Sequence, residues 1–453
     1  MFLIGATSRG RYNWKRRSKW SCCTGEEFGA DTTLQRTFER QIPQQALASR
    51  VKRLTDEGAY TILERANRID RRATRPADKV VHLEIGQPSA APPAHVTEAL
   101  IESVRCGETR YTDPAGLFEL RAAICRYVER THKLPDHSLS PDMVLVGPGA
   151  KPGIVLACLA LLEPGDEALI PDPGFPTYRA AVELCGARAV PYSLSRGTDM
   201  LEIEEIATKI TDRTKLLFLN SPSNPTGGVI SPPIMENLKA LLSCQGAKIW
   251  ILSDEVYSRL WYTDEPETNK YLVPVSVFND AELRSRTILV DGLSKSFSMT
   301  GFRIGYVIAP TQLSERLRVL AVHMYGCVAQ FTQKAAMAAL TEDEKSDRYI
   351  LQTIQQYRRN RDVAYSLLSE LEGCRLAKPR GAFYAWLDVS SYRRPVEDIV
   401  REMLEANKVA VLPGTDFGAQ GEGYLRISFV CDEPTLREGI RRMATTLRRL
   451  RHA

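Results

Sequence analysis

The sequence predicts an α/β fold: a mostly parallel sheet with helices on both faces, together with a smaller α+β domain formed from both ends of the chain. Short apolar runs rich in β-branched residues alternate with helical stretches from about Met143 to Tyr306. This alternation is the pattern of parallel strands joined by crossover helices. The length of 453 residues is enough for a large buried core and for two domains.

Helices and a loop are expected before the sheet. The residue pattern predicts one helix from about Leu47 to Arg71 and another from about Ala94 to Cys106. Between them, the proline-containing stretch IGQPSAAPP (85–93) is expected to form a loop.

After the sheet, long helical stretches are expected beyond about Gln330. The apolar runs AFYAWLDV (382–389) and LRISFV (425–430) are then expected to be strands. In the tail, apolar residues recur at helical spacing: Leu436, Ile440, Met443, Leu447 and Leu450. A docked helix whose arginines face water explains this tail better than a nucleic-acid patch does.

Three of the apolar runs end in polar residues that can carry chemistry. TILV (287–290) leads into DGLSKS, KLLFLN (215–220) leads into SPSNPTG, and KIWIL (248–252) leads into SDEVYS. In open α/β sheets, ligands bind outside the carboxyl ends of the strands. The sequence therefore predicts a site at this rim, with Lys295 just beyond the strand that Asp291 and Gly292 are expected to end.

The composition argues against several classes of protein. Hydrophobic residues make up 43% and charged residues 25% of the chain, and the net charge is only +5; these values are ordinary for a globular protein, and no nucleic-acid partner is expected. No apolar run approaches the roughly 18 residues of a membrane span. The ten cysteines and six histidines are scattered, so we expect neither a metal site nor a disulfide scaffold. Such cysteine usage fits a reducing compartment, and the expected location is cytoplasmic.

The first 25 residues are basic and contain no acid: their charged side chains are Arg9, Arg11, Lys15, Arg16, Arg17 and Lys19. We expect residues 1–45 to form a basic, disordered extension. Two alternatives stay open, namely a transit peptide, which would send the protein to an organelle, and a misplaced start codon.

The polar residues at the rim suggest one kind of ligand. A lysine that forms a Schiff base must lose its proton, and burial or a nearby cation favours that loss. Arg303 supplies a fixed positive charge suited to a phosphate, and VGPGAKPG (146–153) predicts backbone amides at a helix N-terminus, which bind anions. With Lys295, these features indicate a phosphorylated aldehyde, and Asp254 would pair with a protonated pyridine nitrogen.

A set of motifs occurs in a fixed order along the chain: IGQPS (85–89), YTDPAGLFELR (111–121), VGPGAKPG, PDPGFPTY (171–178), NSPSNPTGG (220–228), SDEVYSRL (253–260), GLSKSFSMTGFRIGY (292–306), PRGAFYAW (379–386) and YLRISF (424–429). In this order they resemble the motifs of the fold-type I, pyridoxal-phosphate-dependent class I/II aminotransferases, a group that includes aspartate aminotransferase. The resemblance runs from about Leu47 to the C-terminus. One glycine-rich loop would be weak evidence, whereas the ordered set is specific.

The resemblance implies pyridoxal 5′-phosphate as the cofactor and assigns its reactive partners. Lys295 matches the lysine that holds the cofactor as an internal aldimine and, once released, shuttles a proton between the substrate Cα and the cofactor. Asp254 matches the partner of the pyridine nitrogen. Asn224 and Tyr257 match the pair that hydrogen-bonds the 3′-oxygen of the ring.

The resemblance also implies how the rest of the cofactor is held. Phe175 matches the aromatic residue that stacks on the ring. Arg303 and the backbone of Gly149, Ala150 and Lys151 match the phosphate site.

One position departs from the pattern of the family. Many relatives carry a hydroxyl residue three positions before the lysine that helps to hold the phosphate, and this chain has Gly292 there. Ser294 and Ser296 are the candidates to replace it.

For the substrate, Arg426 matches the arginine that grips the α-carboxylate, and its planar fork suits two parallel hydrogen bonds. Gly86 matches the small residue that lets the substrate approach, and Asn224 also faces the substrate. Tyr111 matches a tyrosine that reaches the phosphate of the neighbouring subunit, so the resemblance implies a homodimer. It further implies a large cofactor-binding domain at 95–325 and a small domain made of 46–94 with 326–453.

The implied activity is transamination between an L-amino acid and a 2-oxo acid by a ping-pong mechanism. A lyase, synthase or decarboxylase on the same fold is the alternative, because the chemistry depends on which Cα bond lies perpendicular to the cofactor ring. A non-enzymatic sensor fused to a DNA-binding domain is less favoured, because the residues before the match are too few for that domain.

Two residues bear on the side chain of the substrate. In a subgroup of the family, the lysine at the position of Lys151 faces the substrate and pairs with a distal carboxylate; alternatively, Lys151 supplies only a backbone amide to the phosphate. LTDEGAYTIL (54–63) matches the segment that closes over the substrate, where Tyr60 would present an aromatic surface. We expect glutamate and 2-oxoglutarate as one donor and acceptor couple, with the second substrate left open.

Overall fold

The structure is a computed structural model that describes residues 47–451, apart from residue 55 and the segments 195–200, 245–247 and 264–272. The chain divides into two compact units, Met1–Lys52 and Arg53–Ala453. In the first unit, the described residues include the short helix α2 (Ser49–Lys52). The extension expected at 1–45 lies outside the described residues.

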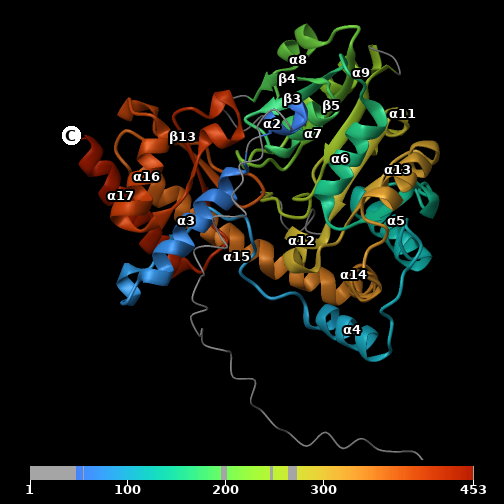
Figure 1. The fold of residues 1–453 in the computed structure, drawn as a ribbon, viewed down its shortest axis with the longest axis horizontal. Helices are drawn as coiled ribbons and strands as arrows, with labels where there is room; N and C mark the ends of the chain where they lie inside the picture. Colours follow the sequence, from blue (N-terminus) through green and yellow to red (C-terminus); the bar gives the residue numbers. More distant parts are fainter. Residues whose placement is uncertain (1–46, 55, 195–200, 245–247, 264–272, 452–453) are drawn as a thin grey trace, which may run out of the picture. The chain divides into compact units, whose positions relative to one another are not determined.

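The centre of the second unit is a seven-stranded sheet (Figure 1). In their order across the sheet, the strands are β2 (Val144–Gly147), β8 (Gly305–Ile308), β7 (Thr287–Gly292), β6 (Trp250–Asp254), β5 (Thr214–Asn220), β3 (Glu167–Asp172) and β4 (Arg188–Ser193). Only β8 runs antiparallel to its neighbours among these strands. The predicted, mostly parallel sheet is therefore confirmed.

Helices pack on both faces of this sheet, as the sequence predicted. They are α4 (Ala94–Arg105), α5 (Phe118–His132), α6 (Ala150–Leu161), α7 (Thr177–Leu184), α8 (Ile203–Lys209), α9 (Pro232–Cys244), α11 (Ala281–Arg284), α12 (Leu293–Ser296), α13 (Thr311–Met324) and α14 (Gln330–Thr341). Successive side chains of a strand point to opposite faces. In β7, Leu289 joins a core with α5 and α14, whereas Ile288 and Val290 join a core with α6, α7 and α13.

A further core joins the beginning and the end of the second unit. Its helices are α3 (Gly58–Arg72), α15 (Asp343–Ser369), α16 (Val396–Asn407) and α17 (Glu433–Arg451). Its strands form a four-stranded antiparallel sheet, in the order β12 (Leu412–Pro413), β13 (Tyr424–Ser428), β10 (Tyr384–Asp388), β9 (Arg375–Leu376), and a parallel pair, β1 (Val81–His82) with β11 (Val409–Ala410). Ile62 and Val81 share this core with Leu436 and Leu450. The predicted late strands and tail helix are thus confirmed as β10, β13 and α17.

The single helix predicted from about Leu47 to Arg71 is wrong. α2 and α3 are separate helices, and Glu57, directly before α3, has an extended backbone (φ −77°, ψ 112°). At Gly58, the first residue of α3, a Cβ atom would lie 1.9 Å from Asp416 Oδ2. Packing against a residue that is distant in the sequence therefore fixes where α3 begins, and helical periodicity carries no sign of that contact.

Other boundaries agree more closely with the prediction. The helix expected near Ala94 to Cys106 is confirmed as α4, whereas β7 continues through Asp291 and Gly292, which were expected to end it. Among the described residues, no helix is long and apolar enough to cross a membrane. The same part of the chain holds no group of three or more His, Cys, Asp or Glu side chains placed to bind a metal ion.

Candidate active site

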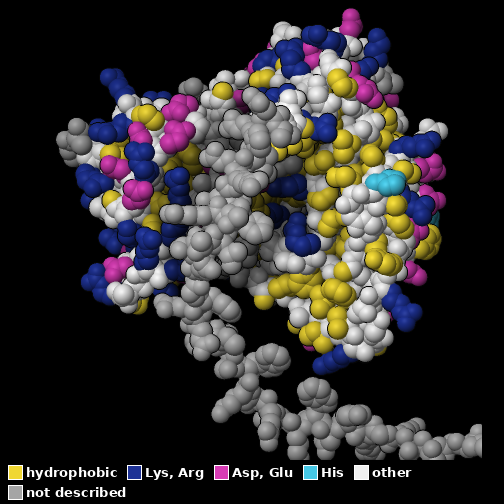
Figure 2. All heavy atoms as spheres, viewed as in Figure 1, with side chains coloured by type: hydrophobic (Ala, Val, Ile, Leu, Met, Phe, Trp, Pro, Cys, Tyr) yellow, Lys and Arg dark blue, Asp and Glu magenta, His cyan; other side chains and the backbone are white. Residues whose placement is uncertain are grey.

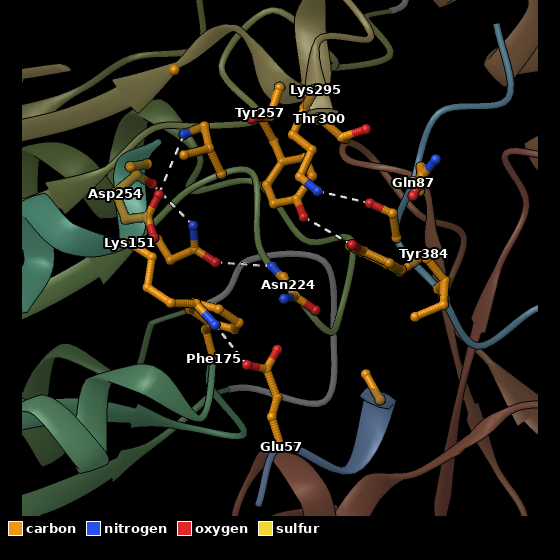
Figure 3. Close-up of a pocket in the computed structure, with 18 of the residues that line it drawn as sticks. Glu57, Gln87, Lys151, Phe175, Asn224, Asp254, Tyr257, Lys295, Thr300 and Tyr384 are labelled. Carbon is orange, nitrogen blue, oxygen red and sulfur yellow. Dashed lines mark hydrogen bonds and ion pairs between the residues drawn. The ribbon is translucent and has the colours of Figure 1, made fainter. Parts of the chain in front are cut away.

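The carboxyl ends of β5, β6 and β7 meet at one pocket, as the sequence predicted. Asn220 ends β5 and lies opposite Asp254, which ends β6. Lys295 follows β7 in the short helix α12. All three line a cavity of about 580 Å³, and Figure 3 shows Asp254 and Lys295 in its wall. The Asn220 amide donates to the backbone oxygen of Asp254 (2.9 Å) and so ties two of these strand ends together.

The amine of Lys295 is partly buried in the lining of this pocket. It donates a hydrogen bond to the backbone oxygen of Gly86 (2.7 Å). Burial lowers the pKa of Lys295 to about 8, and the charges of Arg426 and Arg303 act in the same direction. This lowered pKa makes the uncharged amine more abundant near neutral pH than in an ordinary lysine, and the uncharged form is the one that attacks a carbonyl.

The Asp254 carboxylate is also buried, and burial raises its pKa to about 6. Its Oδ2 accepts a hydrogen bond from the Tyr178 hydroxyl (2.7 Å). Its Oδ1 accepts one from the backbone of Val256 (3.3 Å). These donors hold the carboxylate in one orientation, ready for a positively charged partner, which would favour its ionised form.

The N-terminus of α6 and Arg303 form a cradle beside Lys295. A Cβ atom at Gly149 would lie 2.6 Å from Arg303 Nη2, and one at Gly305 would lie 2.7 Å from the backbone nitrogen of Ala150. The two glycines therefore allow the arginine and the start of the helix to lie close together. Free amides at a helix N-terminus together with a guanidinium make a binding site for an anion.

The hydroxyl groups near this cradle differ in access. Ser294 lines the pocket, together with Gly292 and Thr300. Ser296 is buried and is not among the described residues that line the pocket. Of the two serines considered to replace the missing hydroxyl at position 292, only Ser294 can therefore reach a ligand.

Arg426 also lines the pocket and is almost fully buried. Its guanidinium donates to Asn224 Oδ1 (3.0 Å) and to the backbone oxygen of Glu84 (2.5 Å). It also packs over the ring of Tyr384, 4.3 Å from the centroid. These contacts hold the guanidinium rigidly at the pocket.

Tyr384 connects Arg426 to the residues of the strand ends. Its hydroxyl lies 2.8 Å from the hydroxyl of Tyr257, and both side chains are buried (Figure 3). A Cβ atom at Gly86 would lie 1.9 Å from the Tyr384 hydroxyl oxygen. Gly86 is therefore small because the tyrosine occupies that space, in addition to any need of a substrate.

An ion pair also lines the pocket. The Lys151 amine, on the first turn of α6, donates to Glu57 Oε2 at 2.6 Å (Figure 3). It also lies 5.0 Å from the centroid of the Phe175 ring. Tyr60, on the first turn of α3, also lines the pocket.

The structure brings together most of the residues chosen from the sequence. The pocket-lining residues include Gly86, Ala150, Lys151, Phe175, Asn224, Asp254, Tyr257, Ser294, Lys295, Arg303 and Arg426. Gly149 lies directly behind this lining, against Arg303. Tyr111 is not brought to the pocket by its own chain and is 95% exposed.

Four residues with direct contacts in the site had not been chosen: Glu57, Tyr178, Asn220 and Tyr384. Each lies inside one of the sequence motifs described above. The motifs place these residues near the site but do not predict their contacts. Asn220 could have been found, because it is the last residue of an apolar run at the predicted rim.

Comparison with known sequences and structures gives a consistent result. The family described as aminotransferase class I and II matches residues 78–443. The chain is 35% identical over 378 residues to a probable N-acetyl-LL-diaminopimelate aminotransferase of Bacillus subtilis, covering 83% of this chain and 91% of that protein. It is 35% identical over 409 residues to a probable aspartate/prephenate aminotransferase of Aquifex aeolicus, covering 89% and 99%.

Solved structures agree with these sequence matches. Aspartate aminotransferase from Thermus thermophilus with maleate superposes with a TM-score of 0.80 at 29% identity, covering 88% of this chain and 99% of that chain. An aromatic aminotransferase from Pyrococcus horikoshii superposes with a TM-score of 0.77 at 32% identity, covering 86% and 100%.

Proposed function

The chain belongs to the class I and II aminotransferases, enzymes that move an amino group between an amino acid and a 2-oxo acid, and on this premise we propose how its pocket performs the transfer. The cofactor is pyridoxal 5′-phosphate, Lys295 and Asp254 carry the chemistry, and glutamate with 2-oxoglutarate is one substrate couple. The observation that carries the proposal is the convergence of a low-pKa lysine, a buried carboxylate and an anion cradle on one cavity.

The residues present fit pyridoxal phosphate. The close approach of Arg303 to Gly149, which any side chain at 149 would prevent, suits the phosphate. Asp254 suits the pyridine nitrogen, since a buried carboxylate stabilises a cationic partner. Phe175 offers an aromatic face, and Asn224 and Tyr257 offer polar groups for the ring oxygen.

When bound, the cofactor supplies an aldehyde that receives the amino group and a ring that takes up the electron pair released at the substrate Cα. Lys295 would hold the cofactor covalently and, when its amine is free, would carry a proton from the substrate Cα to the cofactor in one half-reaction and back to the Cα in the other. Its lowered pKa lets the amine act as a base near neutral pH. Asp254 would keep the pyridine nitrogen protonated, and Tyr178 orients this carboxylate.

Arg426 binds the α-carboxylate of the substrate. It is suited to that task because Asn224 and the Glu84 backbone already fix its guanidinium, so little freedom is lost on binding. Tyr257 and Tyr384 form the wall between this arginine and Lys295. A substrate gripped by Arg426 is thereby turned toward the Lys295 amine.

The side-chain end of the pocket carries Lys151 and Tyr60. A lysine beside an aromatic residue suits both a distal carboxylate and an uncharged side chain. Several relatives are named aspartate aminotransferases, and one neighbouring structure holds the dicarboxylate maleate. These names support glutamate and 2-oxoglutarate as one couple, with the second substrate left open.

The active unit is proposed to be a homodimer, with Tyr111 reaching the phosphate site of the neighbouring subunit. Its 95% exposure supports this, because an aromatic ring that belongs to a site in its own chain would not lie in solvent. Figure 2 shows hydrophobic side chains gathered on the face that carries α6 and α13, where Leu159, Val319 and Val322 are exposed.

We also propose that the chain divides into a large domain (95–325) and a small domain (46–94 with 326–453).

The experiment that tests the function follows the two half-reactions separately. Glutamate added to the holoenzyme should convert the visible absorbance of the aldehyde form to that of the amine form, and 2-oxoglutarate should restore it. Loss of the substrate carboxylate as CO₂, or an amine form that no 2-oxo acid converts back, would instead show a decarboxylase or lyase. Lys295→Ala should abolish the absorbance of the covalently held cofactor and the turnover while the protein still folds.

The dimer is tested by mixing subunits. Inactive Lys295→Ala protein and an inactive Tyr111→Ala protein should regain activity when their subunits exchange, because one of the two sites then receives both native residues. A fully active monomer in sedimentation would contradict the shared site.

A further inference from the structure

Glu57 reaches the pocket from an unusual position. It is the last residue before α3, it is not held by a side-chain capping hydrogen bond, and its carboxylate is the partner of the Lys151 amine. The next residue, Gly58, is packed against Asp416 so tightly that no Cβ atom fits. The start of α3 therefore lies directly against Asp416, and the side chain of Glu57 reaches Lys151 on α6.

The charge of Glu57 matters because, apart from Glu57 and Asp254, the charged side chains that line the pocket are positive. Lys151, Lys295, Arg303 and Arg426 all line it. At Lys295, the charge of Glu57 acts to raise the pKa, against the effects of burial, Arg426 and Arg303. Glu57 is thus within electrostatic reach of both the Lys151 amine and the reacting amine.

The ion pair is also open enough to exchange partners. The side chains of Lys151 and Glu57 are 40% and 27% exposed, so water can solvate either group when the pair separates. Partly exposed pairs contribute little net free energy, because solvent competes with the partner. A carboxylate delivered by a bound ligand can therefore displace the carboxylate of Glu57.

We propose that Glu57 determines substrate specificity by competing with the distal carboxylate of the substrate for Lys151. A dicarboxylic amino acid or 2-oxo acid binds by replacing Glu57 as the partner of Lys151. A substrate with an uncharged side chain leaves the pair intact, because the charge of Lys151 is already neutralised. This inference rests on the proposed function, in which Lys151 faces the side chain of the substrate.

The pair accordingly lets one pocket serve both halves of a ping-pong reaction. Without Glu57, an uncharged side chain would lie against an unpaired ammonium, which disfavours burial. With Glu57, the pocket gives up part of its affinity for dicarboxylates, because each must first break an existing ion pair. The wild-type protein should therefore discriminate less between dicarboxylates and substrates with an uncharged side chain than a protein with Lys151 but without Glu57.

The test uses equilibrium binding of two unreactive acids to the holoenzyme by calorimetry: maleate, a dicarboxylate, and hydrocinnamate, a monocarboxylate with an uncharged side chain. Glu57→Gln should lower the Kd of maleate about tenfold and leave the Kd of hydrocinnamate unchanged or raised. Glu64→Gln is the matched control, since Glu64 lies on α3, seven residues after Glu57, and is likewise paired with a basic residue, Arg68, yet does not line the pocket. This control should bind both acids as the wild type does.

The variant Lys151→Ala separates the inference from the proposed function. If Lys151→Ala weakens maleate and hydrocinnamate binding equally, the lysine does not face the substrate side chain, and the proposed subsite fails. If Lys151→Ala selectively weakens maleate but Glu57→Gln fails to tighten it, the competition by Glu57 is refuted. In the double variant, removing Glu57 should give no gain for maleate, because the lysine it competes for is absent. Intact visible absorbance and thermal unfolding of each variant confirm that it is folded and loaded.

Discussion

Lys295 and Glu57 line the same pocket, but they come from regions that are built differently. Asp254 ends β6 and accepts a hydrogen bond from the buried Tyr178, and Lys295 lies just beyond the end of the neighbouring strand β7. Glu57 and Tyr60 stand at the start of α3, where Tyr60 is 63% exposed. The sheet therefore fixes the groups that act on the substrate Cα, whereas α3 presents groups to the substrate side chain. We expect changes at the sheet to affect every substrate alike and changes at α3 to affect substrates selectively.

The largest effect is expected for Asp254→Ala. Without this carboxylate, the protonated pyridine nitrogen loses its partner, and turnover should fall on the order of 10³-fold for every amino acid. The cofactor should remain bound through the phosphate cradle and Lys295, which its visible absorbance would report. Normal turnover with bound cofactor would show that Asp254 is not the partner of the ring.

Tyr178→Phe should have a smaller effect of the same kind. It removes the hydroxyl that donates to Asp254 (2.7 Å), and a hydrogen bond to a charged group contributes about 1.5–3 kcal/mol. We expect kcat to fall about tenfold or more for glutamate, alanine and phenylalanine by similar factors. A loss of kcat confined to one substrate would contradict the expectation that changes at the sheet affect every substrate alike.

Tyr60→Ala tests a group on α3, where the effect should depend on the substrate. Because Tyr60 lines the pocket but is largely exposed, its removal costs only part of an aromatic contact, about 0.5–1.5 kcal/mol. The KM for phenylalanine should rise about fivefold, while kcat and the KM for alanine stay near the wild-type values. Equal changes for both amino acids would indicate that the residue shapes the pocket as a whole.

The smallest expected effect concerns stability at the other end of α3. His82 on β1 lies between Asp70 of α3 (3.0 Å) and the buried Glu84 (2.7 Å). The hydrogen bond with Glu84 raises the pKa of His82 to about 9, against the effect of burial and with help from Asp70. Folding therefore favours the protonated ring, whose stabilising contribution is complete below about pH 6.5 and is lost as the pH rises to about 9.

This contribution is measured by comparing the thermal unfolding of the wild type with that of His82→Gln. The wild type should exceed the variant by about 1–2 °C at pH 6, and the difference should disappear near pH 9.5. A difference that stays constant across this range would mean that the histidine acts through packing and not through its charge. Turnover at pH 7 should change little, because His82 does not line the pocket.

The sequence allowed good prediction of the sheet half of the site. Asp254 and Lys295 come after apolar runs, and parallel strands bring their carboxyl ends to one edge of the sheet. This conclusion requires no knowledge of the contacts between residues that are distant in the sequence. Asn220 ends a third such run but was not chosen as a site residue. The residues of the cradle could be placed for the same reason, since VGPGAKPG lies between a strand and a helix.

The contacts that cross between regions could not be predicted. Tyr178 meets Asp254 from 76 positions away, Tyr384 meets Tyr257 from 127, and Glu57 meets Lys151 from 94. No periodicity encodes such pairs, because they depend on how separate elements pack. The break before α3 failed to be predicted for the same reason: it is set by the packing of Gly58 against Asp416.

The central claim is that Lys295 holds the cofactor, and chemical trapping tests it most directly. The holoenzyme is reduced with borohydride, digested, and its peptides are analysed by mass spectrometry for the added phosphopyridoxyl group. We expect one modified peptide, with the added mass on Lys295 and none on Lys151, although both residues line the pocket. Modification of another lysine, or an unmodified Lys295 in protein that carried bound cofactor, would contradict it.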